Sequence, residues 1–76
     1  MIDMKKILVF KTSVKRKADV QKLTAVLDDL MANDDRWNFD LEDHDKILRI
    51  ESDLMKSTTI ESVLQEEGYY CSELED

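Results

Sequence analysis

A continuous apolar run, residues 7–10, constrains the fold of this chain more than any other feature. The run reads Ile-Leu-Val-Phe, and an unbroken apolar segment of this length is typical of a central strand with both faces covered. We therefore expect a first strand over residues 4–12. If helices cover only one sheet face, two apolar side chains of this strand face the other way, where they either lie under long neighbours or form a dimer contact.

A basic segment follows this strand and leads into a helix predicted over residues 17–31. The apolar residues of that helix recur every three or four positions and form one stripe: Val20, Leu23, Val26, Leu27, Leu30 and Met31. Ser13 is the predicted cap of the helix. Lys15, Arg16 and Lys17 crowd its N-terminus, where the helix dipole favours anions over cations. Cations beside free backbone N–H groups make a surface that attracts an anion.

The remaining residues predict a hairpin, a second helix and a last strand. Strict alternation places Trp37, Phe39 and Leu41 on the inner face of a strand over residues 37–42, and residues 46–51 return as its partner. A second helix starts at residue 57 or 58. Gly68, the only glycine, ends that helix in a left-handed conformation. The last strand is expected over residues 69–74.

The order of these elements is strand, helix, strand, strand, helix, strand. This order predicts an α+β fold, the ferredoxin-like βαββαβ sandwich, with a four-stranded antiparallel sheet and two helices on one face. The predicted strand order across the sheet is fourth, first, third, second. At 76 residues the chain is expected to form a single domain, residues 1–76.

The element order, the length and the helix stop at residues 68–69 resemble the heavy-metal-associated domain of small copper chaperones and metal-pump modules. In that family a first strand runs into Met-Thr-Cys-x-x-Cys, whose two thiolates bind a soft metal such as Cu(I). The matching segment here reads Lys11-Thr12-Ser13-Val14-Lys15-Arg16. Thr12 is shared with the family, Lys11 replaces the methionine, and Ser13 and Arg16 stand where the cysteines would be.

This departure removes the ligands that the family uses. Soft metals prefer thiolate or thioether ligands, whereas a hydroxyl is a poor ligand and a guanidinium repels a cation. The resemblance therefore implies the fold and an interface at this turn without the metal. The alternative is a metal-binding or metal-transport accessory protein, in which Cys71 of two copies binds Cu(I) across a dimer.

Other candidate ligands and nucleophiles are scattered over the predicted fold. We expect the hairpin tip with His44 to lie at the opposite end of the sheet from the basic segment, so that His44 and Cys71 cannot share a metal. Cys71 is either a small semi-buried strand residue or a thiol activated by Lys11 or Arg16. No nucleophile has a base and an orienting group beside it, so no catalytic residue is predicted and the chain is not expected to be an enzyme.

Charge and cysteine content exclude several classes of partner. The net charge of −7 argues against nucleic acids and anionic membranes. The first 25 residues are nevertheless basic, since they contain seven of the 11 basic residues and two of the 18 acidic ones. A single cysteine forms no internal disulfide, and neither a signal peptide nor a membrane span is recognisable, so the expected location is the cytoplasm.

We therefore expect a small, non-enzymatic cytoplasmic domain that binds an acidic protein or a small anion, without a cofactor, as a monomer or weak homodimer. The binding region is the turn over residues 11–17, called the basic turn from here on, with one tyrosine at its rim. The predicted binding residues are Lys11, Thr12, Ser13, Lys15, Arg16, Lys17 and Tyr69. The competing interpretation of the basic turn is an ordinary solvated charged surface.

Overall fold

The computed structural model describes residues 6–32, 34–42 and 44–74 of the chain. Its elements are β1 (Lys6–Thr12), α1 (Lys17–Leu30), β2 (Arg36–Asp40), β3 (Ile47–Ser52), α2 (Ser57–Glu66) and β4 (Cys71–Glu73). All six predicted elements are present in the predicted order, and their ends differ from the predicted ends by at most two residues. The first two positions of the predicted first strand lie outside the described residues. None of the described helices has both the length and the apolar character needed to cross a membrane.

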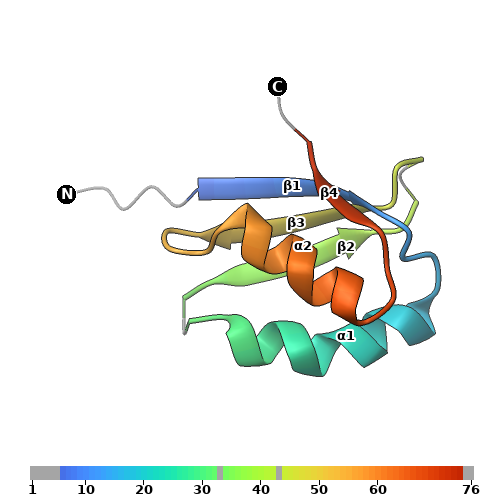
Figure 1. Cartoon of the computed structure of the whole chain (residues 1–76), viewed down its shortest axis with the longest axis horizontal. Helices are drawn as coiled ribbons and strands as arrows, with labels where there is room; N and C mark the ends of the chain where they lie inside the picture. The colour runs from blue at the N-terminus through green and yellow to red at the C-terminus, as the bar shows by residue number, and fades with distance from the viewer. Residues whose placement is uncertain (1–5, 33, 43, 75–76) are drawn as a thin grey trace.

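The four strands form one antiparallel sheet in the order β2-β3-β1-β4 (Figure 1). Read from the other edge, this is the predicted strand order. β1 therefore lies inside the sheet, between β3 and the short strand β4. The continuous apolar run predicted this central position, although it is typical of a strand with both faces covered and the two helices here cover only one.

Both helices pack on the same face of the sheet. The buried residues of α1 are Leu23 and Leu27, and those of α2 are Ile60 and Leu64. These four side chains form one cluster with the fully buried sheet residues Phe10, Leu48 and Ile50. The cluster explains the amphipathic stripe of each helix, because an apolar stripe is stabilised only where it is removed from water.

Neither of the two described helices covers the other face of the sheet. Ile47 on this face is only 5 % exposed, whereas Ile7 of β1 is 61 % exposed and Val9 is half-buried. The strand register places longer side chains beside these apolar residues on the same face. Arg49, for example, lies opposite Val9. Neighbouring side chains thus cover part of this face and leave Ile7 open.

The end of α2 has the predicted glycine stop. Gly68 has φ of +94°, and no heavy atom lies within 4 Å of the position that a Cβ would occupy there. The N–H of Gly68 donates to the carbonyl of Gln65 at 3.0 Å, and that of Tyr69 donates to the carbonyl of Leu64 at 2.9 Å. This pair of bonds ends a helix with its chain reversed into the next segment. It sends the chain from α2 directly towards the basic turn.

Candidate functional site

Three connections meet at one end of the sheet: the basic turn, the β2–β3 hairpin and the segment between α2 and β4 (Figure 1). The prediction that the hairpin tip with His44 lies at the opposite end from the basic turn is wrong. β1 runs antiparallel to β3, so the end of β1 lies beside the beginning of β3. The N–H of Thr12 donates to the carbonyl of Asp45 at 3.3 Å, which joins the basic turn directly to the hairpin.

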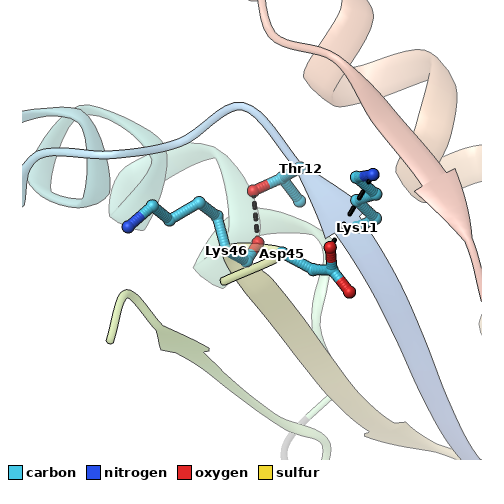
Figure 2. A network of polar contacts seen from close by, with 4 residues as sticks. All are labelled: Lys11, Thr12, Asp45 and Lys46. Carbon is cyan, nitrogen blue, oxygen red and sulfur yellow. Dashed lines mark hydrogen bonds and ion pairs between the residues drawn. The ribbon is translucent and has the colours of Figure 1, made fainter. Parts of the chain in front are cut away.

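Thr12 connects the basic turn to the hairpin through its side chain. Its hydroxyl donates to the carbonyl of Lys46 at 2.7 Å (Figure 2). The same oxygen accepts the N–H of Val14 at 3.1 Å. Thr12 is only 5 % exposed. A buried hydroxyl that both donates and accepts has little capacity left for a ligand. Thr12 therefore shapes the site and does not form its surface.

The hairpin partner of Thr12 has an unusual backbone. Lys46 has φ of +53°, the only positive φ of a non-glycine residue in the described chain. Its ammonium donates to the carbonyl of Leu41 at 2.9 Å, and its own carbonyl accepts the Thr12 hydroxyl. A left-handed lysine costs on the order of 1 kcal/mol and persists where surrounding contacts stabilise it. These two hydrogen bonds are such contacts.

Ser13 lies next to Thr12 and is bound to the segment before β4. Its Oγ accepts the N–H of Tyr70 at 2.8 Å, and its own N–H donates to the carbonyl of Tyr70 at 3.1 Å. The prediction that Ser13 caps α1 is wrong, because the N-cap is Arg16 and no side chain caps this helix. The Ser13 hydroxyl thus takes part in the hydrogen bonding between the basic turn and the segment before β4.

The cations of the basic turn divide into two groups. Lys15, Arg16 and Lys17 are exposed, and within the described part of the chain none of them forms an ion pair. Lys11 instead lies 3.7 Å from the carboxylate of Asp45 on the hairpin (Figure 2). The three exposed cations therefore form a separate cluster around the N-terminus of α1, called the cationic cluster from here on.

The two tyrosines after α2 take different positions. The Tyr69 hydroxyl donates to Asp19 in the first turn of α1 at 2.8 Å, and the Lys22 ammonium lies 5.7 Å from the centre of the Tyr69 ring. The hydrogen bond to Asp19, followed by burial, raises the pKa of the Tyr69 phenol. Tyr69 is thus half-buried against α1, whereas Tyr70 is 56 % exposed beside Ser13.

Tyr70, and not the predicted Tyr69, is the tyrosine exposed beside the basic turn. A signal for it was present in the helix stop, because the second residue after such a helix end commonly packs back onto the helix. That residue is Tyr69, counting from Gly68, so the next tyrosine is the one left at the surface. The order Gly-Tyr-Tyr alone would have distinguished the two.

Cys71 begins β4 opposite Thr12 and is 2 % exposed. Burial, and then the negative charge of Glu61, raises the pKa of the Cys71 thiol to about 12. The thiolate that reacts or binds soft metals is therefore disfavoured at neutral pH. Cys71 is therefore a small strand residue, as in the first interpretation, but it is buried more deeply than the semi-buried position predicted. Neither Lys11 nor Arg16 lowers its pKa.

No group of three or more His, Cys, Asp or Glu side chains suited to a metal ion occurs among the described residues. The predicted residues thus assemble in part: Thr12 and Ser13 join the three connections, and Lys15, Arg16 and Lys17 project around the start of α1. Lys11 and Tyr69 are engaged with Asp45 and Asp19. Comparisons with protein-family models, with curated proteins and with solved structures each find no match to this chain.

Proposed function

We propose that this chain is a small non-enzymatic domain that binds an acidic surface of a partner protein through its cationic cluster. The observation that carries the proposal is the exposure of Lys15, Arg16 and Lys17 without ion-pair partners in the described chain, at the start of a helix that no side chain caps. Each cation at that end costs roughly 0.3–1 kcal/mol against the helix dipole. Local rules are broken in this way where function requires it.

The chemistry of the cluster favours carboxylate or phosphate groups as its ligands. The first N–H groups of α1 lie at the positive end of the helix dipole and have no side-chain acceptor. A carboxylate placed there would accept from these groups and at the same time neutralise the surrounding cations. The binding free energy would then come from the whole assembly of helix end and side chains.

A protein partner fits this surface better than a free small anion. Sites for small molecules are concave and bury most of the ligand, whereas the three cations here are all exposed. Tyr70 adds an exposed aromatic ring beside Ser13, and tyrosine and arginine are enriched at protein interfaces. We therefore commit to an acidic protein segment as the ligand.

We place the chain among ferredoxin-like domains and regard it as a relative of the heavy-metal-associated domain that lacks the metal site. Support comes from the element order and from the basic turn, which follows β1 as the metal motif does in that family. The Ser13 hydroxyl already accepts the N–H of Tyr70, and Arg16 is cationic, so this turn offers no thiolate pair. The burial of Cys71 also argues against the alternative of a copper ion shared by two copies.

A non-enzymatic role is supported by the state of the candidate nucleophiles. The Ser13 hydroxyl is hydrogen-bonded to the backbone, and Cys71 is buried with a raised pKa. Neither is placed as an activated nucleophile, which needs a base within hydrogen-bond reach. A reducing compartment such as the cytoplasm suits the one cysteine of the chain, which is unpaired.

The proposal is tested by NMR titration of the labelled chain with a glutamate-rich peptide and, separately, with inorganic phosphate. We expect peptide-induced shifts at residues 13–17 and Tyr70, which weaken as salt screens the charges. The variant Lys15→Glu/Arg16→Glu should lose these shifts. The control Lys6→Glu/Arg36→Glu changes the net charge equally at exposed strand positions outside both helices and should keep them.

Two outcomes would contradict the proposal. If both double variants lose the peptide shifts equally, binding depends on net charge and not on the cluster. If phosphate shifts the same residues as strongly as the peptide does, the ligand is a small anion and a protein surface is the wrong assignment.

A further inference from the structure

The free edge of β2 carries a sequence that is complementary to itself. Among the described strands β2 pairs only with β3, so its outer side is an edge of the described sheet. Its five residues read Arg-Trp-Asn-Phe-Asp, from Arg36 to Asp40. If two such strands run antiparallel about a two-fold axis at Asn38, Arg36 lies opposite Asp40 of the second copy and Trp37 lies opposite Phe39.

The register of the sheet determines which backbone groups point outward from this edge. The N–H of Leu74 donates to the carbonyl of Val9, so Val9 directs its backbone groups towards β4. Neighbouring residues of a strand alternate, so Phe10 directs its groups towards β3 and pairs there with Leu48. Arg49, the next residue of β3, must then direct its backbone groups towards β2.

The same alternation reaches the outer strand. Arg49 lies opposite Asn38, so these two residues form a hydrogen-bonded pair within the sheet. Trp37 and Phe39, on either side of Asn38, consequently direct their N–H and C=O groups to the free edge. In the two-fold arrangement the Trp37 and Phe39 positions are opposite each other, so they form two hydrogen-bonded pairs with four bonds in total.

The side chains of β2 support the same pairing. Trp37 and Phe39 are half-buried and pack edge to face with ring centres 5.9 Å apart. They line a hollow of about 340 Å³ between α1 and β2, together with Val20 and Leu41. A second copy would bring its own aromatic pair to this edge, and cross-strand aromatic pairs stabilise a sheet by roughly 0.2–1 kcal/mol each.

The charges on the opposite side of β2 are complementary as well. Arg36 is exposed and forms no ion pair in the described chain. Asp40 lies 3.8 Å from Arg49 of its own sheet, so Arg36 of a second copy would extend an existing ion pair into a row. Because the two-fold axis relates the two copies, the same row of charges forms at both ends of the paired strands.

We propose that two copies of this chain associate through antiparallel pairing of their β2 edges about a two-fold axis at Asn38, which joins their sheets into one. A pair of five-residue strands buries much less than the roughly 1,600 Å² of a standard stable interface. The dimer is therefore weak and reversible. An unpaired edge strand is a general site of association, and here the complementary residues select a second copy in one register.

Charge exchange tests the register directly. Arg36→Asp places like charges opposite each other at both ends of the pair, and so does Asp40→Arg. Each variant alone should be monomeric by sedimentation equilibrium between about 10 µM and about 1 mM, a range that covers weak affinities. An equimolar mixture of the two should associate, because every position then faces an opposite charge. Absence of association in a mixture of two folded variants would overturn the proposal.

A measurement on the unaltered chain keeps the test independent of how these variants fold. Amide hydrogen exchange at Trp37 and Phe39 should slow as the protein concentration rises, whereas exchange at Asn38, which is bonded to β3, should not change. The emission of Trp37, the only tryptophan, should shift to shorter wavelength over the same range. Concentration-independent exchange at both positions, or dimers that Arg36→Asp leaves unchanged, would exclude the β2 edge as the contact.

Discussion

At the scale of single residues, Thr12 is the side chain on which the geometry of the candidate site depends. Its hydroxyl joins the end of β1 to the hairpin and to Val14 in the basic turn. Its replacement by an apolar side chain of the same shape leaves a buried N–H and a carbonyl without a partner. Such a loss is costly because water cannot replace the missing bonds inside the fold.

We expect Thr12→Val to lower the free energy of unfolding by about 1–3 kcal/mol in urea denaturation. Thr24→Val is the matched control. The Thr24 hydroxyl donates to the carbonyl of Val20 one turn earlier in the same helix, so its loss should cost about 0.5 kcal/mol or less. Equal losses in the two variants would show that the link between turn and hairpin contributes nothing specific.

At the scale of elements, α1 combines a well-packed apolar stripe with charges placed against its dipole. Leu23 and Leu27 are fully buried, whereas Lys17 begins the helix and no basic residue lies in its last turn. Burial of the apolar stripe stabilises α1, whereas the positive charges at the N-terminus of α1 destabilise it. Asp19 is the only acidic residue in the first turn. A helix optimised for stability alone would carry no cations at its start and would carry basic residues in its last turn.

Lys17→Glu should therefore raise the free energy of unfolding by about 0.3–1 kcal/mol, because a carboxylate at the helix start is favourable. Chemical denaturation at low salt measures the change. Lys6→Glu alters the net charge by the same amount at the beginning of β1, outside both helices, and should not stabilise the chain. A Lys17→Glu variant less stable than the parent would contradict the electrostatic account of α1.

At the scale of the whole molecule, a small fold carries a large excess of negative charge. The molecule measures 39 × 28 × 21 Å and has a net charge of −7. At about 0.01 M salt the screening length is about 30 Å, so charges on opposite sides repel one another, and at 0.15 M it falls to about 8 Å. The folded state thus contains repulsion that moderate salt removes.

We expect the free energy of unfolding to rise when sodium chloride increases from about 0.01 M to about 0.15 M. The variant Asp53→Lys/Glu66→Lys replaces two exposed acids with bases and should respond less. Thermal or urea unfolding at each salt concentration measures both effects. A larger salt response in the variant would mean that local ion pairs, and not the overall charge, control the stability.

The sequence by itself determined the elements, their order and the faces that they bury. Periodicity is a local property, so the stripe of α1, the alternation of β2 and the stop at Gly68 could be predicted from neighbouring residues. The tertiary structure alone decided which connections meet. Thr12 bonds to a residue 34 positions away, and Ser13 to one 57 positions away. No local pattern encodes such pairs, because packing of the whole sheet brings their chain segments together. The place of the basic turn between β1 and α1 could therefore be predicted from the sequence, whereas the contacts of its hydroxyls and of the two tyrosines could not.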